Sequence, residues 1–320
     1  MSILLETKNL KRYYGKKHQK TLVKAVDQVS LKIEKGKSLA LIGESGSGKT
    51  TFGKLIAGLE KPTEGSITFQ GREIQKLSNK ELRNVRRNMQ MIFQSSGGVF
   101  DPQYTIGESI TEILKNYEKM TAAQYREKVS EILQKVGLDA RYANRYVYSL
   151  SGGQCQRANI ARALVLRPKL VICDEPVSSL DYSIRKQILN LLRDMQREFD
   201  VTYLLITHDL SNVPYVCQHV AIMYQGTIVE YIKSTENIEK IAIHPYTKLL
   251  FASIPARRPE DRKIMSGGES SSMAEVFEQG CSFQNRCNKC TVQCQTERPA
   301  LREISKGHFV ACHCCENKKQ

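Results

Sequence analysis

The sequence contains no long apolar segment, and this excludes one broad class of protein. No apolar run approaches the roughly 18 residues that a membrane-spanning helix requires. The first residues, MSILLETKNLKRYY, combine a short apolar patch with acidic and basic side chains, whereas a secretion signal has a longer apolar centre followed by small residues. We therefore expect neither an integral membrane protein nor an exported one. The sequence also has no internal repeat, which argues against a solenoid.

Acidic residues are scarce relative to basic ones. Asp and Glu number 33 against 48 Lys and Arg, so the 320 residues carry a formal net charge of +15. Such an excess favours a polyanionic partner such as nucleotide phosphate, nucleic acid or an anionic membrane, although a solvated basic surface explains it equally well. With 41% hydrophobic and 25% charged residues, the composition predicts a globular protein of two domains, or one large domain with an appendage.

Short apolar segments alternate with segments of helical periodicity along most of the chain, which predicts a parallel α/β sheet. Residues 105–166 form a mainly helical block between two groups of predicted strands. From about residue 254 the composition changes to Pro, Gly, Ser and charged residues without periodicity, which indicates a linker. The expected strands lie within residues 3–35, where a lysine-rich stretch indicates a hairpin, and at residues 38–42, 65–74, 170–175, 202–207 and 219–232.

A glycine-rich segment, GESGSGKT at residues 43–50, matches the pattern G-x-x-x-x-G-K-[ST]. It follows a predicted strand and precedes a predicted helix, the context in which glycines let backbone N–H groups converge on phosphate oxygens. Lys49 then reaches the β- and γ-phosphates of a nucleotide, and Thr50 supplies a hydroxyl to Mg²⁺. The predicted nucleotide-binding residues of this segment are Gly43, Ser45, Gly46, Gly48, Lys49, Thr50 and Thr51.

Two carboxylates follow the apolar run LVIC at residues 170–173. Asp174 would emerge at the end of a buried strand, where its oxygens suit Mg²⁺. Glu175 points elsewhere and is predicted to act as the general base that polarises the attacking water. Alone, such a pair is more often a solvated strand end, but the phosphate loop makes the catalytic interpretation the better one.

The pentapeptide LSGGQ at residues 150–154 narrows the function further, because with the preceding motifs it resembles the signature of the ATP-binding cassette (ABC) family. Ser151, Gly152 and Gly153 would open a helix and offer a hydroxyl and N–H groups to an anion, and Gln154 completes the motif. In the family that anion is the γ-phosphate bound by the opposite subunit. The resemblance therefore implies that two cassettes dimerise head to tail around ATP.

The remaining family motifs are carried over by resemblance. Gln94 resembles the glutamine that senses Mg²⁺ and the attacking water, Asp181 ends the segment that resembles the D-loop, and His208 resembles the switch histidine. Tyr14 occupies the position of the aromatic residue that stacks on adenine, with Tyr13 as the adjacent alternative. Glu175, His208 and Gln94 are thus the predicted catalytic residues, and Thr50, Gln94 and Asp174 the predicted Mg²⁺ site.

The resemblance implies a fold and a division of the chain. The expected fold class is an α/β P-loop NTPase cassette, with a RecA-like parallel-sheet core, an antiparallel β subdomain and an inserted helical subdomain at about residues 95–166. The cassette is expected to span residues 1–255, followed by a linker and a small cysteine-rich C-terminal extension at residues 256–320. ATP and Mg²⁺ are the implied cofactors.

The C-terminal sequence indicates a subfamily. The segments HPYTKLLFASIP, GCSFQNRC, PALRE and HFVAC resemble the end of the ATPases of oligopeptide, dipeptide and nickel importers. This implies an ATP-hydrolysing subunit, peripheral on the cytoplasmic face of the membrane, that powers uptake of peptides, nickel or metal chelates. Its implied partners are a second, different ATPase subunit, two permeases and an extracytoplasmic binding protein.

The alternative is a soluble ABC ATPase that acts on ribosomes or nucleic acid. Such proteins typically carry two fused cassettes or a long coiled-coil insertion, and this chain has neither. It also has no basic motif interleaved with aromatic residues, so we expect no nucleic-acid partner.

Seven of the ten cysteines lie in the last 40 residues, a clustering that favours a metal over disulfides in a chain without a secretion signal. Four thiolates suit either a tetrahedral Zn²⁺ or a [4Fe–4S] cluster, and some members of the subfamily carry an iron–sulfur cluster here. An unligated, reduced tail is the alternative, and the pair Cys287 and Cys290 leaves the ligand set open. The predicted ligands are Cys281, Cys287, Cys294 and Cys312, with Cys290, Cys314 and Cys315 as extra thiols.

Overall fold

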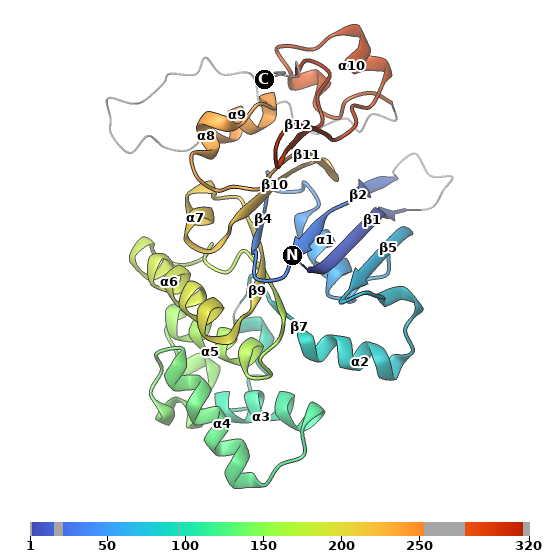
Figure 1. Ribbon diagram of the computed structural model, residues 1–320. Coiled ribbons are helices and arrows are strands. Elements are labelled where there is room, and N and C mark those ends of the chain that lie inside the picture. Colours follow the sequence, from blue (N-terminus) through green and yellow to red (C-terminus); the bar gives the residue numbers. More distant parts are fainter. Residues whose placement is uncertain (1, 16–21, 96, 253–278, 316–320) are drawn as a thin grey trace.

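The chain folds into two β-sheets surrounded by helices (Figure 1). The computed structural model describes residues 2–15, 22–95, 97–252 and 279–315. The linker predicted from about residue 254, and with it the boundary predicted at residue 255, lies outside these described residues. No helix in the described ranges combines the length and the apolar character that crossing a membrane requires.

Five parallel strands form the core of the larger sheet and extend to one of its edges, at β7. Their order is β10-β4-β9-β8-β7, and every residue of β4, β8, β9 and β10 is buried. Their sequences are nearly continuous apolar runs because both faces of a parallel sheet are covered. The bounds are β4 (Leu39–Ile42), β7 (Met89–Ile92), β8 (Leu170–Asp174), β9 (Thr202–Thr207) and β10 (His219–Tyr224).

A smaller antiparallel sheet lies on one face of this core. Its strand order is β2-β1-β5-β6, with β3 paired to β1. Helix α1 (Lys49–Ile56) packs Phe52 and Leu55 between the two sheets. Helices α5 (Gly152–Leu164) and α6 (Tyr182–Phe199) cover the opposite face of the parallel strands. The small sheet consists of β1 (Ile3–Tyr14), β2 (Val23–Val29), β3 (Lys32–Glu34), β5 (Glu64–Phe69) and β6 (Arg72–Glu73).

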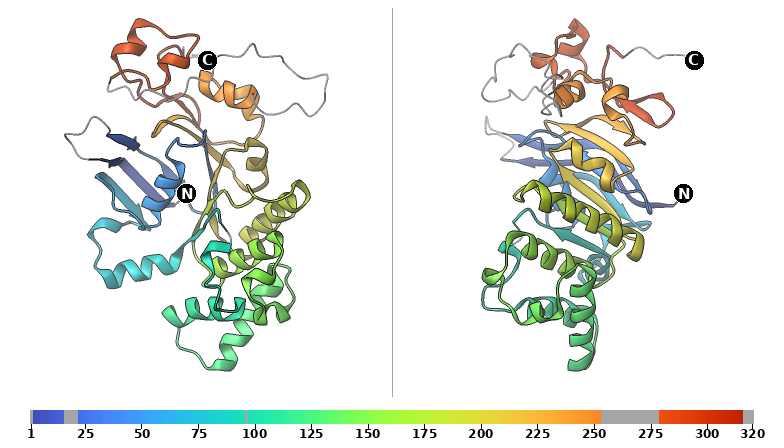
Figure 2. Two further views of the ribbon diagram at one scale, coloured as in Figure 1. Left: turned by 180° about the vertical axis from the view of Figure 1, so that it is seen from behind. Right: turned by 90° about the vertical axis from the view of Figure 1, so that its left-hand side faces the viewer.

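Helices dominate the part of the chain between β7 and β8. Both views in Figure 2 show α3 and α4 at the end of the molecule opposite the C-terminal segment. Each of α2 to α5 begins with a capping box, in which a Ser or Thr and the Glu or Gln three residues later satisfy each other's backbone N–H groups. Helix α2 (Asn79–Asn88) precedes β7, and α3 (Ile106–Tyr117), α4 (Ala122–Lys135) and α5 (Gly152–Leu164) follow it.

The C-terminal segment, residues 279–315, continues the core sheet. Strand β11 (Thr227–Ile232) pairs antiparallel with β10, then β13 (His308–Val310) pairs with β11, and β12 (Arg302–Ser305) with β13. The sequence predicted only a cysteine-rich tail here, so this pairing is a structural finding. The remaining helices are α7 (Val213–Val216), α8 (Ile238–Ile241), α9 (Pro245–Ala252) and α10 (Val292–Thr296).

A buried carboxylate joins β11 to β13. Glu230 is fully buried, and its Oε1 lies 2.7 Å from Nε2 of His308 and accepts the N–H of Ile243 at 2.8 Å. Its Oε2 accepts the N–H of His244 at 3.2 Å. A buried charge is tolerated only when it is paired and hydrogen-bonded in this way.

We expect Glu230→Ala to lower the free energy of unfolding by about 3 kcal/mol, because the substitution leaves His308 and two N–H groups buried without an acceptor. Urea unfolding of the purified subunit measures the change. Glu239→Ala, at an exposed position on α8, is the control and should change stability little. Equal stability of the two variants would contradict the structural role of Glu230.

Candidate functional site

The phosphate loop connects buried strand β4 to helix α1, in the order that the sequence predicted. Gly48 caps α1 with a left-handed φ of 101°. A Cβ atom at this position would lie 1.9 Å from the carbonyl oxygen of Ala25, so only glycine fits. The loop therefore presents its N–H groups at a helix N-terminus, where an anion is favoured.

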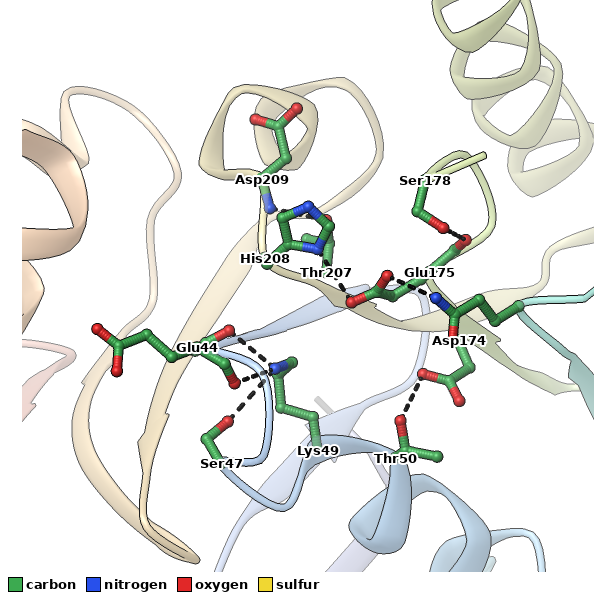
Figure 3. A network of polar contacts seen from close by, with 12 residues as sticks. Glu44, Ser47, Lys49, Thr50, Asp174, Glu175, Ser178, Thr207, His208 and Asp209 are labelled. Atoms are coloured by element: carbon green, nitrogen blue, oxygen red, sulfur yellow. Dashed lines mark hydrogen bonds and ion pairs between the residues drawn. The ribbon is translucent and has the colours of Figure 1, made fainter. Parts of the chain in front are cut away.

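Lys49 lies inside this loop (Figure 3). Its Nζ donates to the carbonyl oxygens of Gly43 at 2.8 Å and Glu44 at 2.7 Å, and to Oγ of Ser47 at 3.3 Å. Burial lowers the pKa of Lys49, while nearby carboxylates oppose this shift. The three loop acceptors are neutral, so the charge of the ammonium group is available to a phosphate in the loop.

Thr50 and Asp174 meet beside the loop. Oγ1 of Thr50 donates to Oδ1 of Asp174 at 3.1 Å, and Asp174 is the last residue of β8. Burial raises the pKa of Asp174, whereas the hydrogen bond from Thr50 lowers it. A hydroxyl and a carboxylate are oxygen ligands of the kind that Mg²⁺ prefers, so these two residues fit the predicted metal site.

Glu175 is held from two sides. Nε2 of Gln94 donates to its Oε2 at 3.1 Å. On the other side, Nδ1 of His208 lies 3.0 Å from its Oε1 (Figure 3). Its backbone has a φ of 46°, a strained conformation for a residue other than glycine. The three predicted catalytic residues thus form one group, next to an open pocket of about 550 Å³ that Asp174, Gln94 and Ser178 help to line.

The signature residues lie outside this group. Ser151 caps α5, its Oγ accepts the N–H of Gln154, and the amide of Gln154 donates to Tyr142 at 2.8 Å. Gly152 and Gly153 lie in the first turn of α5, and Asp181 occupies the N-cap position of α6 without a side-chain capping hydrogen bond. The hydrogen bonds of Ser151 and Gln154 therefore join residues of the helical part of the chain to one another. A contact between the signature residues and a nucleotide remains a prediction.

Tyr13 and Tyr14 end strand β1 in different environments. The hydroxyl of Tyr13 donates to Asp27, and Tyr13 lines a cavity of about 540 Å³ between β1, β11 and the C-terminal segment. The hydroxyl of Tyr14 donates to Glu60, and the guanidinium of Arg12 lies 4.5 Å from the centre of its ring. Stacking of Tyr14 on adenine remains a prediction.

The four predicted cysteine ligands are neighbours in the C-terminal segment. Cys281, Cys294 and Cys312 are buried, and the N–H of Cys281 donates to the carbonyl of Cys294 at 2.7 Å. Burial raises the pKa of Cys281 to about 11, with smaller increases from Cys294, Cys312 and Cys287. Within the described ranges, however, no group of three or more Cys, His, Asp or Glu side chains is arranged to hold a metal ion.

Two residues that the sequence did not single out as site residues, Tyr246 and Arg286, contact the phosphate loop at Glu44. Glu44 in the loop forms a double ion pair with Arg286, and its N–H donates to the hydroxyl of Tyr246. Tyr246 lies in the HPYTKLL segment. The sequence drew attention to this segment only through its resemblance to the importer subfamily. No local pattern connects Glu44 to a partner 242 residues away.

Comparisons with known proteins place this geometry in a family. The ABC transporter family model matches residues 26–178, and a model of the oligopeptide/dipeptide transporter C-terminal region matches residues 229–294. The chain is 42% identical over 320 residues to the oligopeptide transport ATP-binding protein AppF of Bacillus subtilis, with 97% of each chain covered. The chain belongs to the ABC transporter family. It is also 38% identical to OppF of Haemophilus influenzae, with 97% of this chain and 96% of that one covered.

Solved ABC structures share the fold. The dimeric ATP-binding cassette MJ0796, bound to ADP and phosphate, gives a TM-score of 0.64 at 30% identity, covering 72% of this chain and 98% of that one. For cbiO1 of Clostridium perfringens the TM-score is 0.65 at 25% identity, with 79% and 94% covered. The predicted fold class is confirmed. The chain is an ABC ATPase that uses ATP with Mg²⁺, and hydrolysis is coupled to transport.

We expect Glu175→Gln to reduce steady-state ATP hydrolysis by about two to four orders of magnitude, because an amide cannot accept the proton of the attacking water. ATP binding should persist, since Lys49 and the phosphate loop are unchanged. Phosphate release and equilibrium ATP binding measure the two properties. Glu127→Gln, at an exposed position on α4, is the control, and retained turnover in Glu175→Gln would remove Glu175 from the base role.

Proposed function

We propose that this ABC ATPase powers a peptide importer. The observation that carries the proposal is the full-length similarity to oligopeptide transport ATP-binding proteins of two bacteria, together with the match to the oligopeptide/dipeptide transporter C-terminal region. Oligopeptides are the substrate class that we favour over dipeptides, nickel and metal chelates, because the two relatives are named for oligopeptide transport. A role on ribosomes or nucleic acid is not favoured by these relatives.

We infer that residues 1–255 act as the cassette and residues 256–320 as a linker and extension. In the proposed site the phosphate loop and Lys49 hold the phosphates, while Thr50, Asp174 and Gln94 hold Mg²⁺. Glu175 acts as the base, and His208 contacts the γ-phosphate. The proposal is supported by the hydrogen bonds that join Gln94 and His208 to Glu175.

The proposed active unit contains two cassettes. Ser151 and Gly152 are exposed at the start of α5, and Asp181 is exposed at the start of α6. Such helix starts offer N–H groups to an anion, so we assign them to the γ-phosphate held by a second ATPase subunit. In the importer this second subunit is a different chain, and two permeases carry the assembly on the cytoplasmic face of the membrane. An extracytoplasmic binding protein delivers the substrate.

Affinity purification tests the importer. We expect the tagged subunit, taken from gently solubilised membranes, to bring down two permeases and one further ATPase subunit, which mass spectrometry would identify. The Glu175→Gln variant with ATP should increase the recovery, because it retains the closed, ATP-bound dimer. Recovery of ribosomes or nucleic-acid enzymes without permeases would contradict the transport role and leave the ATPase intact.

We also infer that Cys281, Cys287, Cys294 and Cys312 bind a [4Fe–4S] cluster or Zn²⁺. The support is chemical: four neighbouring thiols are the donors that both groups prefer. Hydrogen bonding from the thiol of Cys315 lowers the pKa of Cys312, which favours the thiolate form that binds metals.

Anaerobic purification followed by metal analysis and visible absorbance tests this ligand set. Alanine at Cys281 or Cys287 should remove the bound metal, whereas Cys290→Ala, at an exposed thiol outside the set, should retain it. A visible band identifies the iron–sulfur cluster, and zinc without a band identifies Zn²⁺. Wild-type protein without either metal would support the unligated tail.

A further inference from the structure

Glu44, the second residue of the phosphate loop, is fixed at three points. Its N–H donates to the hydroxyl of Tyr246 at 2.9 Å, and its carbonyl accepts Nζ of Lys49 at 2.7 Å. Its two carboxylate oxygens accept both terminal nitrogens of Arg286, at 2.8 and 2.9 Å. One residue thus connects the lysine of the phosphate loop to α9 and to the C-terminal segment.

Aromatic rings restrict Arg286. Its guanidinium lies 5.8 Å from the ring centre of Tyr224 and 5.7 Å from that of Phe283. Tyr224, Tyr246 and Phe283 pack against one another with ring centres 4.5 to 5.5 Å apart, and Tyr246 and Phe283 are fully buried. Because the ion pair and the rings hold the same guanidinium, few side-chain conformations are open to Arg286.

The segment that carries Arg286 is itself anchored at two other places. Strand β13 pairs with β11 of the core sheet. Arg298 donates to a carboxylate oxygen of Asp27 at 2.7 Å and to its carbonyl at 3.0 Å, and Asp27 also accepts the hydroxyl of Tyr13. Arg286 therefore contacts the phosphate loop from a segment that is itself attached to both sheets.

Glu44 brings a negative charge to the phosphate loop. A carboxylate next to a phosphate loop repels the phosphates of ATP, and a guanidinium in contact with it cancels that repulsion. The double ion pair also holds the backbone of Glu44, whose carbonyl is an acceptor of Lys49.

We propose that Arg286 is a positioning residue for ATP binding. It neutralises Glu44 and holds the phosphate loop. Through Arg286, the C-terminal segment takes part in forming the nucleotide site. This inference rests on the nucleotide site proposed above. It gives the extension a role in the ATPase cycle that does not depend on whether its cysteines hold a metal.

A double-mutant cycle on the full-length subunit tests the proposal. We expect Arg286→Gln to weaken equilibrium ATP binding about two- to fivefold, the range for a partly exposed ion pair, and to raise KM for ATP by the same factor without lowering kcat. In the Glu44→Gln background the same substitution should change ATP affinity little, because no carboxylate remains to be neutralised. A merely structural Arg286 would cause equal losses in both backgrounds, and that result would overturn the proposal.

Two controls separate the possible failures. Lys306→Gln removes one positive charge from an exposed turn of the same segment and should leave ATP affinity unchanged. If it weakens ATP binding as much as Arg286→Gln does, the effect is due to net charge alone and the proposal is overturned. Lys49→Ala tests the site itself. If Lys49→Ala abolishes binding and Arg286→Gln leaves it unchanged, the positioning role is wrong and the site stands, whereas unchanged binding in Lys49→Ala rejects the site.

Discussion

The parallel pairing of β4, β9 and β8 determines where the chemistry of this protein lies. Ile42 pairs with Thr207 and Asp174 with Ile206, so the three strands end at the same edge of the sheet. The phosphate loop, Glu175 and His208 follow these strand ends directly, and Asp174 is the last residue of β8. Since ligands of open α/β sheets bind at the carboxyl ends of the strands, one register brings together residues that are more than 100 positions apart in the sequence.

Much of this arrangement is predictable because its signals are local. The glycines of the phosphate loop, the apolar run before Asp174 and the capping boxes of the helices each specify conformation within a few residues. The family motifs then identified Gln94 and His208, and the structure brings both into contact with Glu175. Periodicity also predicted the segments that form β4, β8, β9, β10 and β11, but it did not predict β7 (Met89–Ile92).

The attachments of the C-terminal segment were not predictable, because the residues that form them are distant from their partners in the sequence. The partners of Arg286 and Arg298 lie 242 and 271 residues away in the sequence. Strand β13 pairs with β11, which lies about 80 residues earlier. A single sequence contains no pattern that couples such positions, because an arginine on a polar loop looks the same whether it is solvated or paired. The cysteines drew attention to this segment, but the described ion pair with the phosphate loop is made by Arg286.

The β12–β13 hairpin also has a consequence for solubility. Without it, β11 would be the edge of the core sheet, with a row of unpaired N–H and C=O groups next to the buried carboxylate of Glu230. Exposed edges of this kind recruit strands from other molecules and lead to aggregation. A shortened chain that ends before β12 would therefore expose the edge of β11 and leave Glu230 without its partner His308.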